Sequence, residues 1–565
     1  MRFFRDAPRV AVLLVVLASS TSATTIDVPG DFATIGEAIT SAVSGDTVLV
    51  HPGTYTGPDN RGLDFEGKSV VLLAAGGADD TVIDCEDADR GVHFHTGEDP
   101  TAQLVGFTIR NGHAERGGAV YCESAAPSIE DCVFESNVAD EAGGGLACAD
   151  AEPVVTDCQF IWNAVTTSGF GFGGGGMHCL SCSPSITGCE FAENGATSGG
   201  GLYCIYSSAP NVTDCVFKEN LASLYHGGGM FCYATSDPVV TDCMFVLNDA
   251  ERNGGGIYCE HSSPRLTGCM FQGNEVLDPL NNFGGGAVSL VESAPEIEDC
   301  DFDGNYAFRG GGVCCRDGSC PSILDCRFIA NTATAGAGIY CVEDSRPLVH
   351  GVFFESGVAT SGGAIYADNG DPTVAGCVFV GNEATGTGTS HGGGAVHLFH
   401  ASSTISDCAF VENLAWRGGA IHLRETASAS LLNSTLSGNS GIEGSGVYCR
   451  TSSVTVGNSI ISFGVGASIE CLSPFGVGVS CTDVFGNSGG DWVGCISGFA
   501  GVSGNVSADP LFCGGGDIWE AYTLREDSPC TSGNSPCGQM GKWGVGCPAT
   551  LVEEATWGSL KALYR

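Results

Sequence analysis

Residues 117–137 read GGAVYCESAAPSIEDCVFESN and contain the two halves of a motif that recurs along most of the chain. One half is Gly-Gly-Ala-Val-Tyr-Cys at 117–122, and the other is Asp-Cys-x-Phe-x-x-Asn at 131–137. Copies of the second half repeat every 25–31 residues, a period typical of a solenoid whose units must stack to bury a core. The phenylalanines of successive units are Phe107, Phe134, Phe160, Phe191, Phe217, Phe245, Phe271, Phe302, Phe328, Phe354, Phe379 and Phe410, with Leu436 next.

Each unit is predicted to be a coil of β-strands, because no segment carries apolar residues at helical spacing over ten residues. The units contain short runs with period two instead, such as Val120/Cys122 and Cys132/Phe134, separated by Gly, Asn, Asp, Ser and Pro. About 26 residues with three short strands would make one coil of a parallel β-helix. The coil should be right-handed, because parallel crossovers almost always are. The predicted fold class is therefore all-β, a right-handed parallel β-helix of at least thirteen coils.

In-register stacking places each position of the motif directly above its equivalent in the next coil. The phenylalanines should therefore form a stack inside the tube, and the asparagines a ladder at a bend. Both columns are interpreted as structural, with Gly357 as the one break in the ladder. The expected ladder is Asn111, Asn137, Asn163, Asn194, Asn220, Asn248, Asn274, Asn305, Asn331, Asn382, Asn413 and Asn439.

Nineteen of the 30 cysteines fall in two further columns. Vertically adjacent cysteines could form disulfides, since their Cα atoms would be about 4.8 Å apart. They could equally be buried thiols that behave as small apolar residues. A zinc site is not expected, because Cys179-x-x-Cys182 has no second pair at a ligand spacing. The first column is Cys132, Cys158, Cys189, Cys215, Cys243, Cys269, Cys300, Cys326, Cys377 and Cys408; the second is Cys122, Cys148, Cys179, Cys204, Cys232, Cys259, Cys315, Cys341 and Cys449.

The chain begins with a pattern typical of a secretory signal peptide, an arginine-flanked apolar run ending near Ala23. No later apolar stretch is long enough for a membrane helix, so the mature chain should be exported without a helical anchor. The expected organisation is a signal peptide at 1–23, an N-terminal cap and first coils at 24–106 with a short helix at 35–43, regular coils at 107–465, an irregular Cys-rich cap at 466–548, and a tail with a possible amphipathic helix at 549–565.

The formal net charge is −43, from 65 acidic and 22 basic residues. This excludes a basic nucleic-acid-binding surface. The excess of acidic residues is expected to form a solvated acidic surface, since no Asp-x-Asp-x-Asp-Gly calcium loop is present. No cofactor or metal site is predicted.

The motifs resemble those of known families. Segment 28–55 is similar to the opening of pectin-lyase-like β-helix proteins. Gly362-Gly363-Ala364-Ile365 and Phe217-Lys218-Glu219-Asn220 resemble the repeats of the polymorphic outer-membrane protein family. This resemblance implies an exported, surface-associated and adhesin-like β-helix. It departs from that family after residue 465, where no block of alternating strands is long enough for a membrane barrel.

A catalytic site is not evident in the sequence. A glycosidase needs two carboxylates across the scissile bond, and the motifs of polygalacturonase-like enzymes are absent. The aspartates that precede the column cysteines, such as Asp131, are expected to be turn residues. His226 and Asn253 share a column, but neither has an evident nucleophile or carboxylate partner. The predicted function is therefore structural or adhesive, with a cell-surface glycan or protein as ligand; a polysaccharide lyase or glycosidase is the alternative.

Three units carry about five extra residues, always between the Asn and the Gly-Gly, at 164–173, 275–284 and 383–392. These long loops leave every fourth coil and should project from one side of the solenoid. Two of them carry aromatic or apolar residues on polar, Gly-rich segments. The predicted partner-binding residues are Phe170, Phe172, Leu280 and Phe283.

Overall fold

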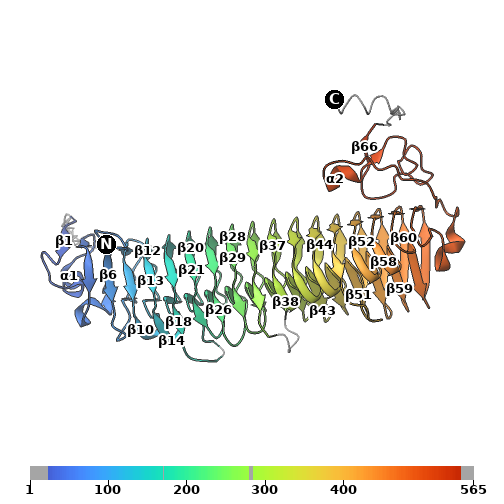
Figure 1. Cartoon of the computed structure of the whole chain (residues 1–565). Coiled ribbons are helices and arrows are strands. Elements are labelled where there is room, and N and C mark those ends of the chain that lie inside the picture. Colours follow the sequence, from blue (N-terminus) through green and yellow to red (C-terminus); the bar gives the residue numbers. More distant parts are fainter. Residues whose placement is uncertain (1–22, 170, 279–283, 549–565) are drawn as a thin grey trace, which may run out of the picture.

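The protein is an elongated parallel β-solenoid, seen from the side in Figure 1. The computed structural model describes residues 23–169, 171–278 and 284–548. The predicted signal peptide, apart from Ala23, and the predicted tail helix therefore lie outside the described residues. Among those that the structure describes, no helix is long and apolar enough to cross a membrane.

Each regular coil has four strands, one more than the sequence predicted. In one such coil they are β15 (Leu146–Ala149), β16 (Val154–Thr156), β17 (Gln159–Ile161) and β18 (Ala164–Val165). We call the sheets to which these strands belong C, A, B and D, and the described residues give them 16, 18, 17 and 13 strands respectively. Strands of sheet D are as short as two residues, too short to show an alternating pattern in the sequence.

Neighbouring coils pair in parallel with the motif in register. Phe134 pairs with Phe160, and Cys148 pairs with Cys179. The phenylalanine side chains are buried inside the tube, with ring centroids 4.7 Å apart for Phe217 and Phe245. The predicted aromatic stack is therefore confirmed from Phe134 to Phe410, where Leu436 continues the column.

The start of both columns was predicted wrongly. Ile109, and not Phe107, pairs with Phe134; Phe107 occupies the cysteine position two residues earlier. The two sites are both inward-facing and apolar, so a period-two pattern fits either register. Asn111 is likewise one residue out of the ladder, because the N–H of Gly112 donates to Oδ1 of Asn137 at 2.8 Å.

The remaining ladder is confirmed, including its break at Gly357, whose N–H donates to Oδ1 of Asn382. The cysteine columns consist mainly of buried thiols. Eighteen of the nineteen column cysteines are free, and Cys148 alone forms a disulfide, with Cys182.

The N-terminal end of the tube carries the short helix α1 (Ile35–Ser41), close to the predicted range. The side-chain oxygen of Thr34 accepts the N–H of Glu37 and caps the helix. Ile35 and Ile39 are buried in the core beside β1 (Thr25–Val28) and β2 (Thr47–Val50). The helix is therefore fixed by its apolar face against the first coils.

At the other end, the 3₁₀ helix η2 (Gly494–Phe499) contacts β62 (Ile469–Leu472) and β63 (Gly476–Ser480) and buries Ile496 in the core. The sequence predicted that the whole Cys-rich segment would cap this end of the tube. The part that follows η2 does not cover the end. It turns back along the outside of the tube, as Figure 1 shows for α2 (Ile518–Ala521) and β66 (Val545–Cys547), and packs against sheet B.

Apolar side chains on the outside of sheet B explain this return. Val378 and Val411 are buried against Tyr522 and Trp543 of the C-terminal segment. Nζ of Lys542 donates to the carbonyl oxygen of Gly376 at 2.8 Å and also bonds the carbonyl of Asp407. Three disulfides stabilise this region: Cys471–Cys495, Cys481–Cys537 and Cys513–Cys547.

Candidate functional site

The outer face of sheet C carries a continuous row of mainly aromatic residues. Each lies between two inward-facing residues of a strand in sheet C, the second of which is most often cysteine, so strand alternation points it away from the core. Tyr203 and Phe231, for example, stack with ring centroids 4.6 Å apart. The row is His93, Tyr121, Ala147, His178, Tyr203, Phe231, Tyr258, Ser289, Cys314, Tyr340, Tyr366, His397, His422 and Tyr448.

The segments that connect sheet D to sheet C cover most of this row. Tyr203 is only 1% exposed. Gly173 crosses its ring so closely that a Cβ atom there would lie 2.6 Å from a ring carbon. A side chain at position 173 would therefore clash with this ring.

Gly171 and Phe172, of the first long loop, lie over the row and help to line a cavity of about 150 Å³. Phe172 lines this cavity, and its side chain is partly buried. It therefore does not project from the solenoid, contrary to the prediction for its loop. Phe170, Leu280 and Phe283, the other predicted binding residues, lie outside the described residues. Arg116, Tyr121, Glu141 and His178 line the same cavity.

The polar groups of the cavity are few and partly paired. The guanidinium of Arg116 contacts the Glu141 carboxylate at 3.1 Å. Nε2 of His178 is buried and has no hydrogen-bond partner among the described residues. Burial, with the nearby charge of Arg116, lowers the pKa of His178 to about 4, so this imidazole is neutral at physiological pH. A neutral ring with a free nitrogen can donate or accept one hydrogen bond.

A second polar cluster lies beneath the third long loop, 383–392. The rings of His397 and His422 stack at 4.3 Å, and neither side chain has a hydrogen-bond partner among the described residues. Burial lowers the pKa of His397 to about 3. Arg417 bonds the Glu443 carboxylate at 2.7 Å and the loop carbonyl of Gly388 at 2.9 Å. Since both histidines are fully buried, this cluster offers no base to a polymer at the surface.

The other residues that the sequence singled out have structural contacts. Nδ2 of Asn253 lies 3.2 Å from Nδ1 of His226, and the His226 ring stacks on Tyr258 at 4.3 Å. Burial lowers the pKa of His226 to about 3. Asp131 and its equivalents adopt positive φ angles close to 52°, which confirms that they are turn residues.

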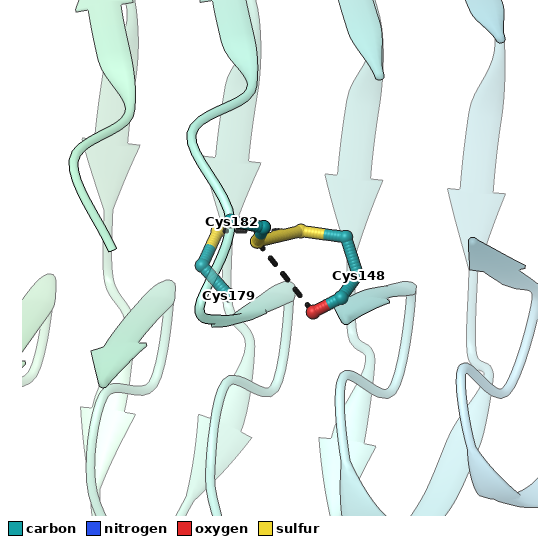
Figure 2. A group of neighbouring side chains, drawn as sticks. All are labelled: Cys148, Cys179 and Cys182. Atoms are coloured by element: carbon teal, nitrogen blue, oxygen red, sulfur yellow. Dashed lines mark hydrogen bonds between the residues drawn. A yellow bond between two sulfur atoms is a disulfide. The ribbon is translucent and has the colours of Figure 1, made fainter. Parts of the chain in front are cut away.

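A cluster of three sulfur atoms was missed in the sequence. Figure 2 shows Cys148 and Cys182 joined in a disulfide, with Cys179 beside them. Sγ of Cys179 lies 3.7 Å from Sγ of Cys148. Within residues 23–169, 171–278 and 284–548, this is the one group of three potential metal ligands with all ligand atoms within 4.8 Å of one another. The sequence placed Cys148 and Cys179 next to each other in one column, but it gave no position for Cys182, which follows β19 (Met177–Leu180).

The comparison with protein families agrees with the fold. A family model described as a right-handed β-helix region matches residues 90–276, 267–398 and 338–506. No curated protein matches the chain significantly. Similar solved structures include the PL6 family alginate lyase AlyGC, with 10% identity, a TM-score of 0.31, and coverage of 87% of this chain and 98% of that chain. Others are pectate lyase Pel9A, with 12% identity, a TM-score of 0.20 and coverage of 93% and 97%, and the Siphovirus 9NA tailspike receptor binding domain, with 10% identity, a TM-score of 0.19 and coverage of 87% and 77%.

Proposed function

The chain belongs to the right-handed β-helix family, and from this premise we propose that it is an exported surface protein that binds glycans without cleaving them. The observation that carries the proposal is the cavity beneath the first long loop, lined by Tyr121, Phe172, His178 and the Arg116–Glu141 pair. Small-molecule sites are typically concave and largely apolar, with a few polar groups that fix the orientation of the ligand.

The size of the cavity indicates how much of a glycan would enter it. A volume of about 150 Å³ is about that of a cavity that accepts one benzene-sized ring. We therefore expect recognition of a single sugar ring, with its apolar face against Tyr121 or Phe172. Hydroxyl groups of that ring would bond Glu141, Arg116 and the free Nε2 of His178.

Charge favours an uncharged ligand. The net charge of −43 repels polyanions at long range, since like charges slow encounter and lower affinity. The guanidinium of Arg116 is already engaged by Glu141. A neutral glycan is therefore a better match for this site than a uronic-acid polymer.

Export and surface display rest on the sequence. The arginine-flanked apolar run within residues 1–23 supports export, and the repeats that resemble polymorphic outer-membrane proteins support display at the cell surface. The alternative function is a polysaccharide lyase or glycosidase. Against it, Glu141 is the one carboxylate in the lining of the cavity, whereas a glycosidase uses two.

The test is a glycan array probed with the full chain and two variants. Tyr121→Ala and Phe172→Ala should each lose at least tenfold in affinity for the glycans that bind. Tyr306→Ala is the matched control, since this tyrosine is exposed on sheet D and away from the cavity. Equal binding by all four proteins would exclude the cavity as the site.

A degradation assay with the wild-type protein and the Glu141→Gln variant decides between binding and catalysis. The protein is incubated with neutral and uronic-acid polymers, and reducing ends and unsaturated products are measured over time. The proposal expects neither product to form. Turnover that the wild-type protein shows and the Glu141→Gln variant lacks would instead establish the enzyme.

A further inference from the structure

Cys182 occupies a position that is serine in the six coils that follow. In four of these coils, the Oγ of Ser236, Ser262, Ser293 or Ser319 accepts the backbone N–H of the equivalent residue in the preceding coil. The N–H of Cys182 donates in the same way to Oγ of Ser208, at 3.3 Å. The side chain of Cys182 thus replaces a hydroxyl with a thiol at this one step of a serine ladder. The serines are Ser208, Ser236, Ser262, Ser293, Ser319 and Ser345.

This substitution coincides with a stacked cysteine pair. Cys148 of β15 and Cys179 of β19 (Met177–Leu180) are in register, and both side chains point into the core. Sγ of Cys182 lies 3.5 Å from the carbonyl oxygen of Cys148, inside the tube (Figure 2). Three sulfur atoms from two adjacent coils therefore meet in a buried, apolar site.

The distance between the sulfur atoms of Cys148 and Cys179 suits two ligands of one metal ion. With metal–sulfur bonds of about 2.3 Å, two thiolates on one metal are about 3.8 Å apart in tetrahedral geometry and about 4.0 Å apart in trigonal geometry. The 3.7 Å between Cys148 and Cys179 is close to both values. Structural zinc takes four ligands, but Cys122 and Cys204, the column neighbours, are not within the 4.8 Å group. Thiolates also select Cu(I), to which three ligands are suited.

We propose that Cys148, Cys179 and Cys182, when all three are reduced, form a three-thiolate site for Cu(I), and that the Cys148–Cys182 disulfide is the closed state of that site. Opening requires a small-molecule thiol or phosphine as reductant. Two electrons and two protons convert the S–S bond into two thiols, and the reductant is oxidised. Binding of Cu(I) then releases the thiol protons to solvent, because the thiolate is the ligand.

The experiment compares the full-length protein with two variants after anaerobic reduction. Cu(I) is supplied as a complex with a chromophoric chelator, and the copper retained by the protein is measured from the absorbance of that complex. Cys182→Ser restores the residue usual at this position, so the fold should be kept; circular dichroism checks this. Cys122→Ser is the matched control, from the same buried column but outside the three-sulfur group.

The expected result is a high-affinity Cu(I) equivalent that the reduced wild-type protein and Cys122→Ser retain and Cys182→Ser loses. The unreduced wild-type protein should lack the same equivalent. X-ray absorption of the copper-loaded protein should show three sulfur neighbours. Equal copper binding by both variants would mean that the thiol columns bind copper without a specific site, and would overturn the proposal. Absence of any high-affinity copper in the reduced wild-type protein would also overturn it.

Discussion

Oδ1 of Asn248 accepts two hydrogen bonds from Asn220, one from its side-chain Nδ2 at 2.9 Å and one from its backbone N–H at 3.1 Å. The same Nδ2 of Asn220 also donates to the carbonyl oxygen of Phe191 at 2.8 Å. One side chain thus satisfies buried polar groups in three successive coils. Since this pattern repeats along the tube, the ladder fixes the bend between sheets B and D.

Asn220→Ala should lower the free energy of unfolding by about 1–3 kcal/mol, because it leaves the Phe191 carbonyl and other buried groups without partners. Urea unfolding measures the change. Asn211→Ala is the control, since Asn211 is exposed on the outer face of sheet A and should change stability by less than about 0.5 kcal/mol. Equal effects of the two substitutions would mean that the ladder does not stabilise the coil.

Phe245→Ala should cost about 3–5 kcal/mol, because it opens a cavity between two stacked rings. Phe245 is fully buried and lies 4.7 Å from Phe217 and 4.9 Å from Phe271, measured between ring centroids. Phe245→Leu should cost much less, since Leu436 fills the same position beyond Phe410. Urea unfolding of both variants measures the two changes in the free energy of unfolding. Similar decreases for the two variants would contradict a requirement for side-chain volume at this site.

Asp483 should make stability depend on pH. Burial raises the pKa of its carboxyl from 3.8 to about 6, so the folded protein binds this proton more tightly than the unfolded chain. Its contribution to the free energy of unfolding is fully present below about pH 4 and is lost as the pH rises through 6. Asp483→Asn should therefore be more stable than wild type at pH 8, by about 2 kcal/mol, and similar to it at pH 4.

Thermal unfolding from pH 4 to pH 8 measures this effect. The asparagine can still accept the N–H of Ala508, which donates to the carboxylate in the wild-type protein. Asp299→Asn is the matched control, since it makes the same substitution at an exposed turn aspartate. A constant difference between Asp483→Asn and wild type over this range would rule out the titration of Asp483 as the cause.

Lys542→Met should loosen the C-terminal segment without unfolding the tube. The substitution removes the hydrogen bonds of Nζ to the carbonyl oxygens of Gly376 and Asp407. Limited proteolysis should cut within 506–548 several times faster, while the main thermal transition stays unchanged. Lys218→Met, which changes a lysine exposed on sheet B, should behave as wild type in both measurements. A fall in the main transition would show that the segment stabilises the whole solenoid.

The period and the residue types were enough to predict the coils, the stacked phenylalanines and most of the asparagine ladder. They failed where two inward positions fit the same alternation, so Phe107 was placed in the column of Ile109. The C-terminal segment turns back because Val378 and Val411 face outward from coils that precede it by more than 90 residues in the chain. No local sequence pattern reveals such a contact.

The site was predicted less well than the fold, for the same reason. Phe172 was expected to project from the solenoid with its loop, but it lines one cavity together with Tyr121 and His178. The three-sulfur group needs Cys148 from one coil and Cys182 from the turn of the next, 34 residues later in the chain. Contacts between coils follow from the exact register, which spacing alone leaves undetermined by one or two residues.

The coil-on-coil pairing that builds the tube also offers a template for a second molecule at each end. A strand in the last coil presents unpaired N–H and C=O groups, to which another chain could add in the same register. At one end η2 lies against β62 and β63, and at the other α1 lies against β1 and β2. We therefore expect these two short helices to hinder the head-to-tail addition of a second molecule, which would otherwise produce a fibre.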